Sequence, residues 1–149
     1  MKGTLDFLVR KWNMGHDTGL LIFRLVLGIV LIYGHGFKKM SVILSGQEIQ
    51  FLDPIGIGAS TSFYLAAFAE GICSILLILG LFSRIATLIL SMNFLVIVIF
   101  HAFMVGDGFA ILELRFLYLF SFIALTLTGP GKWSLDYILF QGNNKLDKT

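Results

Sequence analysis

Residues 62–82 read SFYLAAFAEGICSILLILGLF, a stretch that is long and apolar enough to cross a bilayer as one helix. Its only charged residue, Glu70, lies near the middle. An ionised side chain at membrane depth is costly, so such a residue usually has a partner or a function. The stretch therefore predicts an integral membrane protein with a polar feature in its interior.

The composition of the whole chain favours the same conclusion. Its 149 residues are 57% hydrophobic and 13% charged, with a mean hydropathy of +0.90. A soluble domain carries about a quarter charged residues. The net charge of +2 is too small and too dispersed to indicate a nucleic-acid-binding surface. The single cysteine, Cys73, cannot form an intrachain disulfide, and we interpret it as a packing residue.

Four apolar segments predict an all-α fold, an integral membrane four-helix bundle formed by one domain over residues 1–149. The predicted spans are 19–37, 62–82, 85–105 and 112–128, each near the ~20 residues that cross a bilayer. Residues 38–61 mix apolar and polar side chains, so we expect an outer segment that lies in the membrane interface. Within that segment, Asp53-Pro54 is expected to end a short helix.

Basic residues outside the spans predict the orientation of the chain. Seven lie on the side of the two termini and two on the opposite side: Lys2, Arg10, Lys11, Arg84, Lys132, Lys145 and Lys148 against Lys38 and Lys39. Cytoplasmic segments carry the excess of Lys and Arg in membrane proteins. We therefore expect both termini in the cytoplasm.

Three polar residues within the spans form the first candidate group. A rise of 1.5 Å per residue places Arg24, Glu70 and Asn93 at depths that bracket the midplane. One interpretation is a structural ion pair between Arg24 and Glu70, with Asn93 as a hydrogen-bond partner. The other is a functional polar pocket, or a carboxylate that relays protons.

A second candidate group gathers toward the outer ends of the spans. His35 shares a helix face with Arg24, and His101 shares one with Asn93. Together with a nearby carboxylate, the two imidazoles could bind a metal, move protons or hydrogen-bond a quinone-like headgroup. The alternative is that each histidine caps a helix end. Two scattered histidines and one carboxylate are too weak a pattern to predict a metal site.

The carboxylate of that group is Glu113, at the start of the fourth span. Arg115 lies two positions further on, so the two side chains point to nearly opposite sides of the helix. We expect Glu113 to face the bundle, because Phe116 and Leu117 continue its face.

Several motifs follow one another in a fixed order. They are Arg24-Leu25-x-Leu27-Gly28, His35-Gly36-Phe37-Lys38-Lys39, Glu70 followed by Leu77-Ile78-Leu79-Gly80-Leu81-Phe82-Ser83-Arg84, His101, and Gly129-Pro130-Gly131-Lys132-Trp133-Ser134-Leu135-Asp136. This set resembles the DoxX family of small four-span bacterial membrane proteins over nearly the whole chain. The chain departs from simpler members in its long, semi-apolar outer connection.

The resemblance implies a four-helix bundle in the bacterial inner (cytoplasmic) membrane, in a family often associated with redox chemistry. Members have been linked to thiosulfate:quinone oxidoreductase and to membrane complexes that guard against oxidative stress. By the matching positions, the resemblance implies a site among six residues: Arg24, His35, Lys38, Glu70, His101 and Glu113.

Three functions remain open at this point. The first is a quinone-interacting or accessory subunit of a membrane oxidoreductase, with no covalently bound cofactor and a candidate ligand site at His35, Lys38, His101 and Glu113. The second is a non-catalytic membrane scaffold or assembly factor. The third is a small-molecule or lipid carrier, which ranks last because no inverted repeat is visible. Expected partners are the lipid bilayer and another membrane or redox subunit, or a second copy of the chain, and no nucleic acid.

Overall fold

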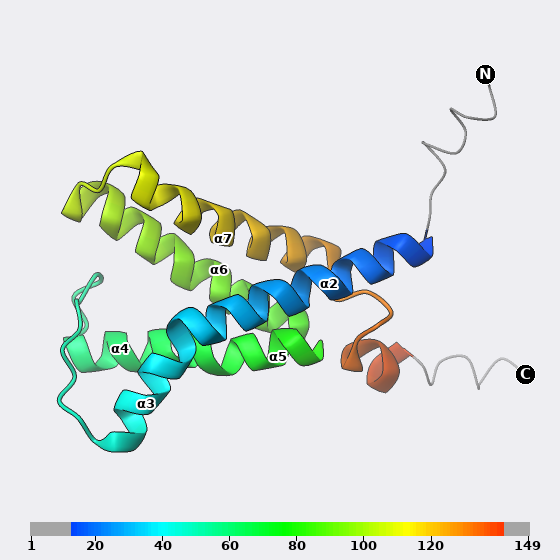
Figure 1. Ribbon diagram of the computed structural model, residues 1–149, viewed down its shortest axis with the longest axis horizontal. Helices are drawn as coiled ribbons and strands as arrows, with labels where there is room; N and C mark the ends of the chain where they lie inside the picture. The colour runs from blue at the N-terminus through cyan, green and yellow to red at the C-terminus, as the bar shows by residue number, and fades with distance from the viewer. Residues whose placement is uncertain (1–12, 142–149) are drawn as a thin grey trace, which may run out of the picture.

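The computed structural model describes residues 13–141, which form a bundle of long helices (Figure 1). Four helices are long and apolar enough to cross a membrane: Met14–Ser45, Ala59–Leu79, Ser83–Val105 and Phe109–Thr128. The predicted all-α, four-span membrane bundle is therefore confirmed.

The first span is longer than predicted. It consists of α2 (Asn13–Leu31), a π-helical turn η1 (Ile32–Gly36) and α3 (Phe37–Ser45). The predicted span ends at residue 37, but the helix continues to Ser45 and is capped by Gly46, which adopts a left-handed conformation with φ of 64°. No proline lies between residues 13 and 45 to interrupt the helix, and a glycine in the left-handed conformation is a common way to end one. The non-helical part of the connection is therefore confined to residues 46–58.

The other three spans follow in antiparallel order. The second consists of α4 (Ala59–Ala67), η2 (Phe68–Cys73) and α5 (Ser74–Leu79). The third consists of α6 (Ser83–Ile99) and η3 (Phe100–Val105), and the fourth is α7 (Phe109–Thr128). A short π-helical turn, η4 (Tyr137–Gln141), ends the described chain.

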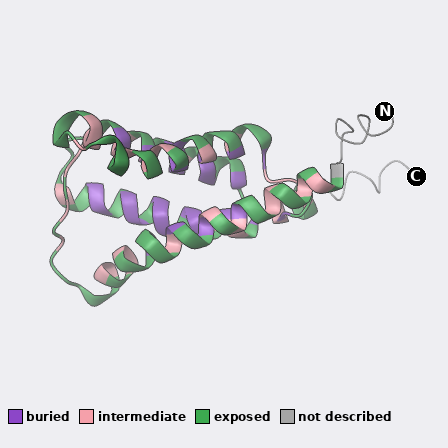
Figure 2. Cartoon of the chain, turned by 45° about the horizontal axis from the view of Figure 1, so that its top comes forward, coloured by how far each residue is buried: buried purple, intermediate pink, exposed green. Residues whose placement is uncertain are grey.

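The second span is the central helix of the bundle. In its most apolar window 56% of the residues are buried, against 22% in each of the other three spans. Figure 2 shows this helix as the most continuously buried one. On either side of it, α2 packs against α5 and α6 packs against α7 (Figure 1). Lipid tails are as apolar as the helix faces, so the hydrophobic effect does not hold membrane helices together. Close packing of this kind stabilises the bundle instead.

The bundle has two chemically different ends. The loop end carries residues 46–58 and 106–108, and the terminal end carries the start of α2, the turn at 80–82 and residues 129–141 (Figure 1). Arg84 and Lys132 lie at the terminal end. The other basic residues that predicted a cytoplasmic terminal end lie outside the described residues: Lys2, Arg10, Lys11, Lys145 and Lys148. The orientation stays a prediction.

Asp53 fastens the long connection to the start of α4. The expected short helix before Asp53 is absent from residues 46–58. Instead, the carboxylate of Asp53 accepts hydrogen bonds from the backbone N–H groups of Ile57 and Gly58 at 3.1 and 2.7 Å, and from the Ser62 hydroxyl at 2.7 Å. These bonds, led by that of Ser62, lower the pKa of Asp53 below its ordinary value.

Candidate ligand-binding site

The carboxylate of Glu70 is buried in the bundle and has two side-chain partners. It lies on η2 and is 3% exposed. The ammonium group of Lys39 forms an ion pair with one carboxylate oxygen. The amide of Asn93 donates a hydrogen bond of 3.1 Å to the other. Side chains from three spans therefore meet at this carboxylate, two of them from the predicted polar core.

The predicted ion pair between Arg24 and Glu70 is wrong. Arg24 is buried too, but its guanidinium donates to backbone carbonyl groups near the terminal end. In a helix each Cα–Cβ bond tilts toward the N-terminus. The first span begins at the terminal end and the second at the loop end, so the two side chains lean apart. The same tilt brings Lys39, further along the first span, back toward Glu70.

Gly36 lets the first span approach η2 closely enough for this ion pair. A Cβ atom at Gly36 would lie 2.7 Å from the carbonyl oxygen of Glu70, which no side chain can tolerate without a backbone shift. Lys39 follows three positions later and so lies on the same side of the helix. The glycine therefore positions the cation beside the buried acid.

The polar residues of the loop end line a cavity of about 520 Å³, which we call the polar cavity. All four spans contribute polar lining residues, and the connection adds Gln50: the residues from the spans are His35, Lys39, Glu70, His101, Arg115 and Tyr118. Phe94, Ile97 and Leu114 form part of an apolar wall. The rings of Phe94 and Tyr118 pack at a centroid distance of 4.9 Å. A cavity of this size with a few polar groups on an apolar wall is typical of small-molecule sites.

The imidazole of His101 lies between the carboxylate of Asp107 and the guanidinium of Arg115. Its Nδ1 atom lies 2.7 Å from a carboxylate oxygen of Asp107, and its Nε2 atom lies 3.5 Å from the guanidinium of Arg115. A carboxylate oxygen accepts hydrogen bonds and a guanidinium donates them, so the geometry suits Nδ1 as a donor to Asp107 and Nε2 as an acceptor from Arg115. The Asp107 backbone N–H also donates to the His101 carbonyl at 3.0 Å. This arrangement fixes the imidazole at the cavity edge.

The expectation that Glu113 faces the bundle is wrong, because Arg115 faces it instead. Arg115 lines the polar cavity and is partly buried, whereas Glu113 is exposed. The physical reason lies further along α7, where Tyr118 and Phe122 are buried at i+3 and i+7 from Arg115. Leu117, which was expected to continue an inward face with Glu113, is 60% exposed.

Of the two adjacent lysines, Lys39 and not the predicted Lys38 belongs to the site. Lys38 is exposed and does not line the polar cavity, whereas Lys39 is partly buried within it. A signal was present in the sequence, because Lys39 lies four positions after His35 and so shares its helix face. His35 itself lines the cavity while remaining exposed.

Three site residues lie in π-helical turns. His35 is in η1, Glu70 in η2 and His101 in η3. A π-helical turn inserts one residue into the helical repeat and rotates the side chains that follow, and such turns occur frequently at functional sites. This local feature was not predicted from the sequence.

The guanidinium of Arg24 lies at the terminal end of the bundle, opposite the polar cavity. It is 1% exposed, and its guanidinium donates to the carbonyl oxygens of Trp133 and Leu77 at 2.6 and 3.4 Å. Asp136 lies in the same region and accepts hydrogen bonds from the backbone N–H groups of Phe82 and Ser83 at 2.7 and 2.8 Å. The acid thereby caps the first turn of α6. Residues 129–136 thus fold back over the turn between the second and third spans.

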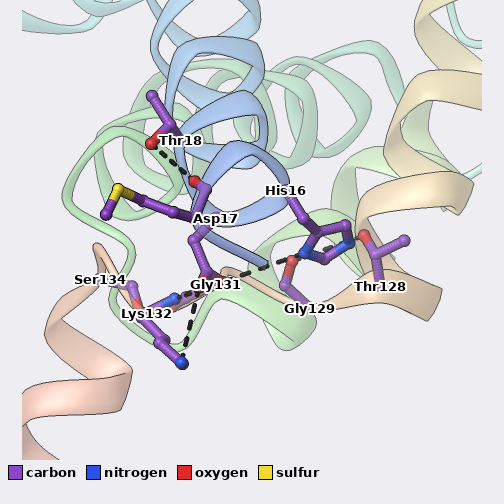
Figure 3. A network of polar contacts seen from close by, with 9 residues as sticks. His16, Asp17, Thr18, Thr128, Gly129, Gly131, Lys132 and Ser134 are labelled. Atoms are coloured by element: carbon purple, nitrogen blue, oxygen red, sulfur yellow. Dashed lines mark hydrogen bonds and ion pairs between the residues drawn. The ribbon is translucent and has the colours of Figure 1, made fainter. Parts of the chain in front are cut away.

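Asp17 attaches the same segment to α2. Its carboxylate accepts a hydrogen bond of 3.2 Å from the backbone N–H of Lys132 and lies 3.9 Å from the Lys132 ammonium (Figure 3). A second cavity, of about 550 Å³, lies here. Its two lining carboxylates, Asp17 and Asp136, are already bonded to the backbone. The polar side chains of the terminal end therefore hold segments of this chain together and close the bundle.

The fold and the cavity define a multi-pass α-helical membrane protein with a polar site at one end. The chain belongs to the DoxX family, whose family model matches residues 19–102. No curated protein and no solved structure matches the chain. The matched region includes His35, Lys39, Glu70 and His101 and ends before Arg115. Among residues 13–141, no three His, Cys, Asp or Glu side chains gather in an arrangement that could hold a metal ion.

Proposed function

We propose that the protein is a quinone-interacting accessory subunit of an oxidoreductase complex in the bacterial inner membrane, and that the polar cavity holds the quinone headgroup. One observation carries the proposal. The cavity brings two imidazoles, an ammonium group, a guanidinium and a carboxylate from all four spans against an aromatic wall. Polar groups in a membrane protein that converge on a cavity usually mark a substrate or ion pathway.

The residues of the cavity match the chemistry of a quinone. A quinone is a flat apolar ring with two carbonyl oxygens that accept hydrogen bonds. Arg115 and Lys39 supply donors, and Phe94 and Tyr118 supply ring surfaces. Reduction to the quinol adds two electrons and two protons. In this proposal the electrons come from a partner redox subunit, and His101 with Asp107 passes protons between the headgroup and the loop end.

The test measures quinone retained by the full chain. The protein is purified in native-lipid nanodiscs, and bound quinone is extracted into organic solvent and counted per protein. His101→Ala is compared with His16→Ala, since His16 lies at the terminal end. Arg115→Met is compared with Glu113→Gln, an exposed residue on the same helix. We expect the first variant of each pair to lose quinone. Quinone absent from the unmodified protein, or retained equally by all variants, would contradict the proposal.

A scaffold or assembly factor is the second candidate. The contacts at the terminal end favour it, because Arg24, Asp17 and Asp136 serve to hold segments of this chain together. A pull-down in mild detergent separates the two readings. A scaffold retains its partner and the activity of the complex when His101 and Arg115 are replaced, whereas a quinone subunit retains the partner and loses quinone-dependent turnover.

A further inference from the structure

A third cavity, of about 390 Å³, adjoins the polar cavity between the second span and α6, and we call it the apolar cavity. Leu65, Phe68, Met92 and Val96 contribute to its walls. Several of these side chains are exposed in the structure, Met92 by 57% and Leu65 by 54%. Exposed apolar side chains in the middle of membrane-spanning helices contact acyl chains. The apolar cavity therefore borders the lipid.

The two cavities share a wall. Phe51, Pro54, Glu70 and Ile97 line both of them. Phe51 packs edge-on against Phe63 at a centroid distance of 5.4 Å, and the Lys39 ammonium lies 5.9 Å from its ring centre. Since Phe51 belongs to the non-helical segment 46–58, the partition on this side is a side chain from a loop and not a helix backbone. Polar and apolar spaces thus meet at Glu70.

We propose that the two cavities form one site for an amphiphile, with the headgroup in the polar cavity and the isoprenoid chain of a membrane quinone in the apolar cavity. This inference rests on the function proposed above and extends it to the route of entry. The isoprenoid chain would pass Phe51 and Ile97. The quinone would enter laterally from the bilayer, between the second span and α6. A quinone's two chemically distinct parts match the two chemically distinct spaces.

The geometry makes a prediction about which part of the ligand each cavity recognises. The isoprenoid chain of a quinone moves from lipid into the apolar cavity. Its contribution to the binding free energy therefore arises from packing and not from the hydrophobic effect. Filling the cavity with a larger side chain should weaken a chain-bearing ligand and leave the headgroup contacts intact. Overpacking of this kind typically costs about tenfold or more in affinity.

The experiment measures binding of three probes to the full chain in nanodiscs: a benzoquinone with a ten-carbon chain, the same benzoquinone without the chain, and oleate. Met92→Trp fills the apolar cavity, and Leu65→Trp fills it from the opposite helix as a second variant. Leu88→Trp is the matched control, because Leu88 is exposed on α6 but lines neither cavity. We expect both filling variants to weaken the chain-bearing quinone about tenfold and to leave the chainless one unchanged.

Each outcome bears on a different statement. Equal binding of both quinones, unaffected by Met92→Trp and Leu65→Trp, would overturn the two-cavity site while leaving the quinone function standing. Oleate binding that the filling variants weaken, without binding of either quinone, would overturn the quinone function and support a chain site for another amphiphile. Binding of none of the probes would overturn both.

Discussion

Arg24 and Glu70 are both buried charges within the same bundle, yet they serve different ends of it. The Arg24 guanidinium donates to two backbone carbonyl groups and is covered by residues 129–136. The Glu70 carboxylate contacts two side chains, Lys39 and Asn93, and lines two cavities. A charge bonded to backbone is fixed by the fold, whereas a charge bonded to side chains beside open space can exchange a partner for a ligand. The contrast assigns Arg24 to the closure of the bundle at its terminal end and Glu70 to the candidate ligand site.

The largest effect is expected from Gly80→Ala at the terminal end. Gly80 has φ of 69°, and a Cβ atom there would overlap the Arg24 guanidinium and lie 2.7 Å from the Ser134 Cβ. Left-handed backbone strain and overpacking together should lower the free energy of unfolding by about 4 kcal/mol. Unfolding in a denaturing detergent titration measures it.

The control for that variant is Gly46→Ala. Gly46 has a similar φ of 64° with no neighbour within 4 Å of an added Cβ atom. Gly46→Ala should therefore lower the free energy of unfolding by the backbone strain alone, about 1–2 kcal/mol. If both variants lose the same stability, contact between residues 129–136 and Arg24 does not close the terminal end.

A somewhat smaller effect is expected from Lys39→Met at the loop end. Removing one partner of a buried ion pair leaves Glu70 uncompensated, which should cost about 3 kcal/mol of stability. The same titration measures the loss, and Lys38→Met, an exposed neighbour, is the matched control. Adding Glu70→Leu to Lys39→Met should restore much of the stability without restoring quinone binding. Failure of that double variant to recover stability would show that the ion pair is not what Lys39 contributes.

Asp136→Ala should have a moderate effect. It removes the acceptor for two N–H groups at the start of α6, a capping loss of about 1–2 kcal/mol. Asp17→Ala, which removes one backbone hydrogen bond and a long ion pair, should cost less than about 1 kcal/mol. Thermal unfolding of both variants compares them, and a larger loss for Asp17→Ala would contradict the capping role of Asp136.

The smallest effect is the pH dependence of the loop. Because hydrogen bonds lower the folded pKa of Asp53, their stabilisation is complete above the ordinary aspartate pKa of about 3.9 and is lost as pH falls through the lower folded value. Hydrogen exchange at Ile57 and Gly58, corrected for intrinsic rates, should accelerate at acid pH. Asp53→Asn should remove the pH dependence. An unchanged profile in that variant would assign the effect to another group.

The sequence was sufficient for the fold and for part of the site. The apolar runs predicted four spans because the bilayer dictates helix length. Of the candidate site residues, His35, Glu70 and His101 line the polar cavity, and Asn93 lines the apolar cavity beside it. The pairing of charges was mispredicted because matching depth ignores the direction in which side chains lean. Arg115 was missed because two apolar neighbours suggested the wrong face of α7.

Other features depend on contacts that no local pattern encodes. The π-helical turns under His35, Glu70 and His101 arise within otherwise regular apolar helices. The choice of Lys39 over Lys38 depends on Gly36, whose role becomes visible only when the first span lies against η2. Residues 129–136 were identified as a motif, but their closure over Gly80 and Arg24 joins segments far apart in the chain.

Photolabelling with a quinone analogue tests most directly whether ligand chemistry is confined to the loop end. The full chain in native-lipid nanodiscs is irradiated with a photoreactive quinone, with and without excess unlabelled quinone, and the labelled peptides are identified by mass spectrometry. Displaceable label should fall on residues 46–58 and 97–115. Displaceable label concentrated on residues 129–140, or label that excess quinone fails to displace, would contradict the account.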